Sequence, residues 1–509
     1  MNRPNFSAAS LRAWFQHEIE EPVLDKAGGP ARFKVILLLA CVLGLDAADQ
    51  ATVGAVAVQL EQALHIGNVE IGLLVTVSTA IGAFATLPLG ILVDRIHRVR
   101  LLIAAIITWS LAMIASGASD SYLMLLVTRI ALGAIVATAA PAVASLVGDF
   151  FHPGERGRIY GFILTGELVG AAFGYLVSGV VGDVSTWRAA FWVLAAVGLT
   201  FAAALWRWLP EPKRGGQSRI WPGARKVPKA EEGAEKERPP KHVKTETDPV
   251  EEEISDAAID PHPELVLHED PARMSWWHAV RYVLSIRTNI ILIIASALGY
   301  FYYTGLRTFG VVFMQGRFDL DQSTGTTLLV GIGLGSIAGV LIAGRIADGL
   351  IQRGHFTARI WVAGVCLLIA AGLFVPGLLT PSLMVAAPLL FIAAAGVGGA
   401  NPPSDAARLD IMHSRLWGRA ESVRAALRYA FEAIAPITFG YVSTLFGGSG
   451  AAFGRATQAQ TGHGLAVTFL VMLLPLAAAG VILLFGVRTY PLDVATAIAS
   501  EEEADSPSC

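Results

Sequence analysis

The sequence predicts an all-α membrane protein whose twelve transmembrane helices form two pseudo-symmetric six-helix bundles. The chain has 509 residues, of which 54% are hydrophobic and only 16% are charged, and its mean hydropathy is +0.56. Soluble domains carry about 25% charged residues, so this composition argues against a soluble enzyme. Cys41, Cys366 and Cys509 lie far apart in the chain, so they indicate neither a disulfide framework nor a metal cluster.

Each half of the chain contains six apolar segments of the ~20 residues that a spanning helix requires. In the first half we expect spans near 34–58, 69–93, 99–118, 122–148, 159–182 and 188–208. In the second half we expect spans near 289–313, 324–347, 357–379, 383–411, 419–446 and 463–487. The two bundles thus cover 34–208 and 289–487, with a cytoplasmic segment over 1–33 and a cytoplasmic tail over 488–509. Residues 274–288 are rich in Trp and Arg and predict an interfacial helix.

A charged segment separates the two bundles. Residues 211–273 hold 15 acidic and 11 basic side chains and nine of the 25 prolines, without an apolar period. Such a composition cannot bury enough apolar surface to order itself, so residues 209–273 are expected to be a disordered cytoplasmic linker. A tail that docks on lipid or on a partner is the alternative.

Lys and Arg residues set the expected orientation. Thirteen of them fall in loops on one side of the predicted spans and three on the other. The richer side, which includes both termini, should be cytoplasmic, and the protein should lie in the plasma membrane. The N-terminus has no separate apolar region with a cleavage site, so we expect no removable signal peptide.

Three short patterns of the first half recur in the second half in the same order. The loop after span two, G-x-L-x-D-R-x-x-R at 90–98, has its Gly and Asp repeated 254 residues later. The pattern Asp-x-x-His followed by Gly-Arg at 149–158 returns 261 residues later, and Phe-Gly-Tyr at 173–175 returns at 439–441. Parallel six-helix repeats place a substrate path between the halves near the membrane midplane and allow rocking.

These motifs resemble those of a known family. The repeated loop at 90–98 is similar to the signature loop of the major facilitator superfamily. Arg129-x-x-x-Gly133 resembles that family's second motif, and Gly166, Gly170 and Gly174 resemble its glycine-rich antiporter motif. The resemblance implies the fold of that family and a secondary transporter working by alternating access.

A narrower resemblance covers the first span. Asp49-Gln-Ala-Thr-Val53, followed by Glu61-Gln62 and Ile66-Gly67, is similar to spinster-like transporters. Those relatives carry lysophospholipids or sphingosine phosphate, and bacterial ones are often described as drug exporters. This chain departs from them at Gln50, where they have a basic residue, and at Val136, where they have an acid.

Four ionisable residues of the first half fall within predicted spans and are candidates for proton coupling: Asp46, Asp49, Arg129 and Glu167. A charge at the helix centre costs about 2.5–3.5 kcal/mol on insertion scales, so such residues are functional candidates. Asp46 and Asp49 have i, i+3 spacing, which places them on one face near the midplane. Arg129 should pair with these carboxylates, and Glu167 should bind a proton or a cationic headgroup. The alternative roles are structural: a tie between spans one and four for Arg129 and a packing hydrogen bond for Glu167.

Polar residues in the spans of the second half are candidates for substrate binding: Arg307, Asn401, Asp405, Arg424, Arg428 and Glu432. The last three follow i, i+4, i+8 and form one stripe on span eleven, which should face the cavity or span ten. Arginine suits phosphate geometry, so the sharper interpretation is the binding of an anionic group. A structural salt-bridge network, with Arg307 as an interfacial anchor, is the alternative.

The family resemblance also implies a gating role for loop residues. In that family the loop Asp lies near a neighbouring helix end and arginines, and it stabilises the outward-open state. The matching residues here are Asp94, Arg95, Arg98, Arg156, Arg158, Asp348 and Arg353. The alternative is that these charges serve only the membrane topology.

Motifs of catalysis and of nucleotide binding are missing from the sequence, so we expect neither an enzyme nor a cofactor or metal site. Energy should then come from an ion gradient, and the expected function is proton-coupled export of an amphipathic, drug-like compound. A lysophospholipid is the alternative substrate, and a receptor or scaffold that does not transport is the second alternative. The expected partners are the substrate, protons and membrane lipids, without nucleic acid, and the expected state is a monomer.

Overall fold

The computed structural model describes residues 29–151, 156–212, 259–268, 274–413, 416–447 and 458–505, and the regular elements there are all helices. The first half comprises α3 (Pro30–Ala55), α4 (Ala57–Leu64), α5 (Asn68–Arg95), α6 (Arg98–Gly117), α7 (Tyr122–Val136), α8 (Ala139–Phe150), α9 (Arg156–Val184) and α10 (Trp187–Trp208). The second half comprises α12 (Trp276–Val283), α13 (Arg287–Phe318), α14 (Gln322–Ile351), α15 (Ala358–Leu379), α16 (Leu383–Gly399), α17 (Asn401–Asp410), α18 (Trp417–Phe446) and α19 (Gln458–Asp505).

Eleven segments of the described chain are long and apolar enough to cross a membrane. They include α7 with α8 and α16 with α17, each pair counted as one segment. The 30-residue α18 packs among them and brings the number of long segments to the expected twelve. Its Arg424, Arg428 and Glu432 lower its hydropathy, because charged side chains weigh heavily on a transfer scale. The all-α class with two six-helix halves is therefore confirmed.

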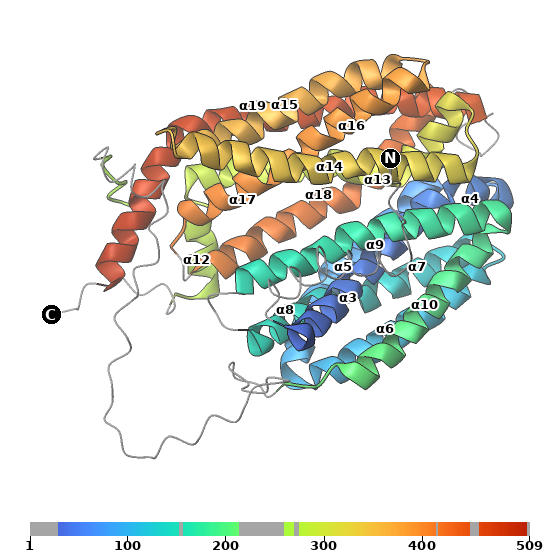
Figure 1. Cartoon of the computed structure of the whole chain (residues 1–509), viewed down its shortest axis with the longest axis horizontal. Helices are drawn as coiled ribbons and strands as arrows, with labels where there is room; N and C mark the ends of the chain where they lie inside the picture. Colours follow the sequence, from blue (N-terminus) through green and yellow to red (C-terminus); the bar gives the residue numbers. More distant parts are fainter. Residues whose placement is uncertain are drawn as a thin grey trace, which may run out of the picture.

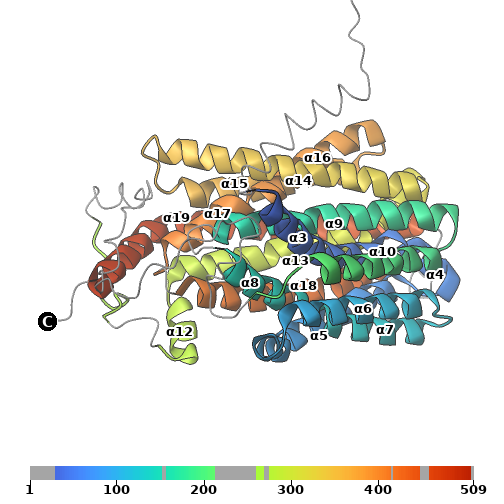
Figure 2. The same ribbon diagram turned by 60° about the horizontal axis from the view of Figure 1, so that its bottom comes forward.

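The two halves lie side by side with their long helices roughly parallel (Figures 1 and 2). We call the end of the bundle at which α3 begins and α19 ends the terminal side, and the opposite end, where α4 lies, the far side. Within the first half α3 packs on α9, and within the second half α14 packs on α16. Between the halves, α5 contacts α18, α9 contacts α14, and α3 contacts α13.

Glycines permit the closest helix contact of the first half. A Cβ on Gly170 would lie 2.1 Å from the carbonyl oxygen of Gly44, and a Cβ on Gly166 would lie 2.3 Å from that of Ala40. Real side chains do not come that close to backbone, so only glycine allows α9 to approach α3 here. The glycine row found in the sequence thus holds α3 in place, and α3 carries Asp46 and Asp49.

Aromatic rings form the core of the second half. Tyr302, Phe313, Phe374, Phe439 and Phe469 are almost completely buried, and neighbouring rings have centroids 5.2–6.3 Å apart. Most of the pairs are edge-on, the geometry that aromatic quadrupoles favour. This cluster joins α13, α15, α18 and α19 and sets the orientation of α18 beside the interface between the halves.

Ordered structure extends beyond two of the expected boundaries. Helix α19 continues to Asp505, whereas the sequence predicted a span ending at 487 and then a tail. Its extension buries Tyr490 and Val494, so tertiary contacts stabilise helix beyond the apolar segment. Residues 259–268, placed in the predicted linker, pack on this extension: the N–H of His262 donates to Thr496 Oγ1 and that of Leu267 to Ser500 Oγ. The rest of the linker lies outside the described residues, except for 209–212.

Candidate substrate cavity and buried charge pair

A cavity of about 250 Å³ lies between the two halves. Helices α3 and α9 line one wall, and α13, α17 and α18, together with residues of α14, α15, α16 and α19, line the other. The charged residues that line it are Asp46, Glu167, Arg307, Arg428 and Glu432. Because both signs of charge occur in one cavity of the membrane region, it suits a ligand that has polar groups as well as an apolar body.

On the first-half wall, Gln50 connects a carboxylate to an arginine of the other half. The side-chain amide of Gln50 donates to Asp46 Oδ1 at 2.9 Å, and its Oε1 accepts a hydrogen bond from Arg307 Nη2. Tyr175 OH donates to the backbone oxygen of Arg307, which gives α9 and α13 a second contact at this level. Asp46 and Arg307 are therefore coupled across the interface through one neutral side chain.

On the second-half wall, Arg428 lies among aromatic rings. Its guanidinium carbon is 4.5 Å from the ring centre of Tyr300 and 4.9 Å from that of Tyr429. Its Nε lies 3.5 Å from Glu432 Oε1, one helical turn further along α18. At this distance the pair is loose, so the guanidinium keeps its capacity to bind an anionic group.

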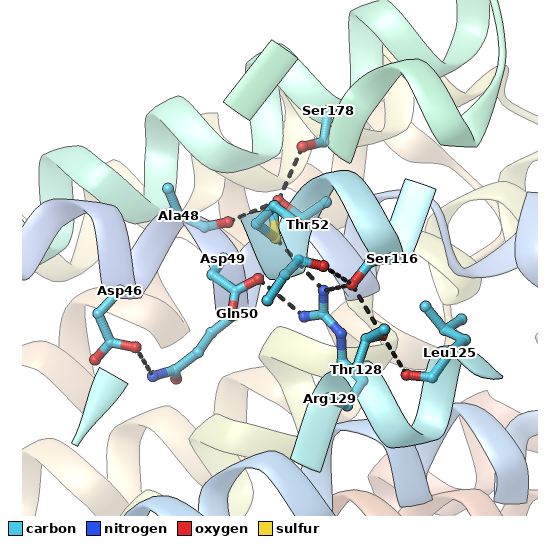
Figure 3. A network of polar contacts seen from close by, with 12 residues as sticks. Asp46, Ala48, Asp49, Gln50, Thr52, Ser116, Leu125, Thr128, Arg129 and Ser178 are labelled. Atoms are coloured by element: carbon cyan, nitrogen blue, oxygen red, sulfur yellow. Dashed lines mark hydrogen bonds and ion pairs between the residues drawn. The ribbon is translucent and has the colours of Figure 1, made fainter. Parts of the chain in front are cut away.

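A second arginine–carboxylate pair is sealed inside the first half (Figure 3). Arg129 Nη1 lies 2.9 Å from Asp49 Oδ1, and only 2% and 3% of the two side chains are exposed. Arg129 Nη2 donates to Ser116 Oγ at 3.3 Å, and the guanidinium lies 5.1 Å from the ring centre of Phe191. The pair ties α3 to α7 and α6, and its burial separates it from the cavity.

The structure gives Asp46 and Asp49 different partners. Figure 3 shows Asp46 bonded to Gln50, and Asp49 bonded to Arg129. A spacing of three residues leaves side chains about 60° apart around a helix, enough to divide them between two surroundings. The expectation of one shared carboxylate site therefore needs correction: Asp46 lines the cavity and Asp49 is buried behind it.

The expected stripe on α18 is also divided. Arg428 and Glu432 line the cavity together with Asn401, whereas Arg424 and Asp405 are not part of its lining. Arg424 Nη1 donates to Ser296 Oγ at 3.2 Å. Asp405 Oδ1 lies 3.3 Å from Arg408 Nη2, on a side chain that is 53% exposed. These two residues therefore have partners within the second half.

The described loop residues show where part of the expected gate lies. Arg98 is buried at the start of α6, where its backbone N–H and Nε donate to Glu211 Oε1 at 3.0 and 3.2 Å. Asp348 and Arg353 are exposed at the end of α14 and just beyond it. The side chains of Asp94, Arg95, Arg156 and Arg158 lie outside the described residues.

Three tyrosines and a glutamine of the cavity were not among the predicted site residues: Tyr300, Tyr303, Tyr429 and Gln50. Tyr300 and Tyr303 belong to an aromatic run in span seven, and Tyr429 follows Arg428 directly. An aromatic run in a spanning helix more often packs against neighbours or lipid, so composition alone does not single it out. Within the described residues, no group of three His, Cys, Asp or Glu side chains is arranged to hold a metal ion.

Comparison with known proteins shows which family and which relatives this chain resembles. The family model of the Major Facilitator Superfamily matches residues 39–436. The uncharacterized transporter YybO of Bacillus subtilis is 20% identical over 380 residues, which cover 74% of this chain and 79% of that protein. The uncharacterized transporter YgaY of Escherichia coli O157:H7 is 30% identical over 134 residues, 26% of this chain and 33% of that protein.

Spinster proteins are among the relatives. Human protein spinster homolog 1 is 28% identical over 194 residues, 37% of this chain and 37% of that protein. The matches to YgaY and to spinster homolog 1 therefore span about a third of those relatives. A crystal structure of a bacterial homolog of the human lysosomal transporter spinster, inward-facing and occupied, has a TM-score of 0.69 at 19% identity over 91% of this chain and 98% of that chain. At this identity the likeness shows a shared fold.

Proposed function

The chain belongs to the major facilitator superfamily, and we propose that it is a proton-coupled secondary transporter that exports an amphipathic small molecule by alternating access. The observation that carries this proposal is the cavity of mixed charge between the two halves. In a parallel-repeat transporter the substrate site lies at this interface, where rocking of the halves exposes it to each side in turn.

We assign proton exchange to the carboxylates that face the cavity, Asp46 and Glu167. A proton-coupling group has to meet water on one side and then on the other, and both residues line the space that would open. Asp49 and Arg129 are sealed within the first half, so we assign them the positioning of α3 against α7. Through α3 they hold Asp46 and Gln50 at the cavity.

The chemistry of the cavity supports a substrate with an apolar body and a charged head. Tyrosine rings supply flat apolar surface, and Arg307 and Arg428 supply guanidinium groups. We propose a drug-like organic compound as the substrate. A lysophospholipid is the second candidate, because two cavity arginines and the spinster relatives favour a phosphate headgroup.

The orientation is part of the proposal. We place the terminal side in the cytoplasm of a cell whose plasma membrane contains the protein as a monomer. The excess of Lys and Arg in the loops on that side supports this orientation.

Thermal-shift screening of the purified protein against drugs and lysophospholipids, followed by transport of the hits into proteoliposomes, tests the function. We expect an imposed pH gradient to drive uptake by the wild type, and Asp46→Asn to abolish this dependence while the hit still binds. Asp405→Asn is the matched control, because Asp405 lies outside the cavity lining. Transport that ignores the pH gradient would refute proton coupling, and phospholipid hits alone would select the second candidate.

A further inference from the structure

The short helix α4 lies at the interface between the halves on the far side (Figure 1). Its residue Leu60 and the preceding Val56 are fully buried, in one hydrophobic cluster with Phe309 and Phe313 of α13. Helix α4 also contacts α5, and Gln59 Nε2 donates to the backbone oxygen of Gly182 at the end of α9 at 2.7 Å. This helix therefore packs against both halves where they meet.

Contacts between the halves close the far side around α4. Asn68 Nδ2 donates to Ser443 Oγ at 2.9 Å, which joins α5 to α18. Gln322 Nε2 donates to the backbone oxygen of Gly179 at 3.3 Å, which joins α14 to α9. A Cβ on Gly72 would lie 2.3 Å from the carbonyl oxygen of Pro436, so the two backbones touch. We call these contacts the far-side gate.

Helix α4 carries an acidic residue, Glu61, that the proposed transport cycle does not use. Glu61 is half-buried, and its Oε1 is shielded from solvent and has no hydrogen-bond partner in the described chain. A carboxylate buried without a partner is costly to ionise, whereas the protonated acid is tolerated. Burial, followed by the negative charge of Glu70, raises the pKa of Glu61 from 4.5 to about 8.

The charges around Glu61 also favour its protonated form. Glu70 is on α5, with Oε2 accepting from the N–H of Gly67 at 2.9 Å, and its charge repels an ionised Glu61. At the far-side ends of the packed elements, the other charged or titratable groups include Asp183 on α9, Arg317 on α13 and His65 beside α4. None of these three contributes to the shift at Glu61. Within the described residues, Glu61 therefore has no cation to stabilise its charge.

We propose that Glu61 is a proton-operated latch of the far-side gate, protonated while α4 is packed against α13 and ionised when the halves separate there. The latch rests on the proposed alternating access. Opening would also expose the shielded oxygen to water, and the carboxyl group would then ionise near its ordinary pKa of 4.5. The closed gate is thus favoured at low pH, and its advantage is lost as the pH rises through about 8.

Spin-label distances across the far side measure the gate directly. We would place labels at Ser185→Cys, after α9, and Ser382→Cys, before α16, since both positions are exposed. The three native cysteines would be replaced by serine, and the full chain would be reconstituted in liposomes. Between pH 8 and pH 6.5 we expect the wild-type ratio of closed to open gate to rise by up to tenfold per pH unit.

Glu61→Gln cannot ionise, so we expect its gate to stay closed and its ratio to be constant over this range. Glu502→Gln, an exposed acid at the end of α19, is the matched control and should keep the wild-type response. Glu61→Asp keeps an ionisable group and should also retain it, which separates a missing latch from a misfolded helix. A wild-type response in Glu61→Gln overturns the latch alone. A wild-type gate that stays closed at every pH overturns the alternating access on which the latch rests.

Discussion

Each half contains an arginine–carboxylate pair, and the two pairs have opposite surroundings. Arg129 and Asp49 are 2.9 Å apart and almost fully buried. Arg428 and Glu432 are 3.5 Å apart, 19% and 13% exposed, and line the cavity. The sealed pair has already exchanged its water for fixed protein partners, whereas the open pair still has a side that a ligand can reach. Access to the cavity, more than residue type, therefore separates a structural ion pair from a binding one.

Removing one partner of the sealed pair should have the largest effect. Arg129→Ala leaves Asp49 buried without its cation, and breaking a buried pair in this way costs about 3–5 kcal/mol. We expect a large fall in the thermal midpoint of the detergent-purified protein. The double variant Arg129→Gln with Asp49→Asn should recover part of the loss, because no charge is then left unpaired. An unchanged midpoint in Arg129→Ala would show that the pair is not structural.

The next largest effect should come from the helix contact that positions the sealed pair. Gly170→Val would place side-chain atoms in the backbone of Gly44, and overpacking of this kind costs about 1–3 kcal/mol. We expect a lower thermal midpoint together with weaker ligand binding, because α3 carries residues of both regions. Gly372→Val, at a glycine with open space around it, is the control. Equal behaviour of the two variants would contradict the close approach of α3 and α9.

For the pair that lines the cavity, Arg428 and Glu432, we expect a smaller effect on stability and a larger effect on ligand binding. Arg428→Ala should lower the thermal midpoint less than Arg129→Ala does, since the pair borders the cavity, where water can solvate the remaining Glu432. The affinity for an anionic or zwitterionic hit should fall more than tenfold, because a hydrogen bond to a charged group contributes about 1.5–3 kcal/mol. Calorimetric titration measures this loss, and Arg424→Ala, outside the cavity lining, should bind normally. A variant that binds normally but unfolds early would place Arg428 with the sealed pair.

The smallest effect is expected for an acid in open water. Asp321 caps α14, where hydrogen bonds from Ser323 Oγ and then from the N–H of Thr324 lower its pKa from 3.8 to about 2. Its stabilisation is therefore complete above pH 3.8 and is lost as the pH falls through about 2. Asp321→Ala should lower the thermal midpoint slightly at pH 6, and the difference from the wild type should shrink below pH 4. If the difference in thermal midpoint grew in acid instead, the lowered pKa of Asp321 would be contradicted.

Part of the site was predictable because membrane burial makes charge rare. The low charge density of the spans drew attention to Asp46, Asp49, Arg129, Glu167, Arg428 and Glu432, and the structure places all six in the cavity or in the sealed pair. Which of these residues line the cavity and which form the sealed pair was not predictable. Asp46 and Asp49 differ by a small rotation about α3, and whether that rotation points to a cavity or to α7 depends on how the neighbouring helices pack.

By itself the sequence determined the membrane class, the two homologous halves and the short set of intramembrane charges, because spanning length and the cost of burying charge act on local stretches of chain. Only the tertiary structure decided which carboxylate meets which arginine. It also decided that α19 continues to Asp505 and that one carboxyl oxygen of Glu61 is shielded from solvent beside the far-side gate. These features depend on contacts between residues far apart in the chain, such as Asp49 with Arg129 and Asn68 with Ser443. Local composition does not encode which distant surfaces meet.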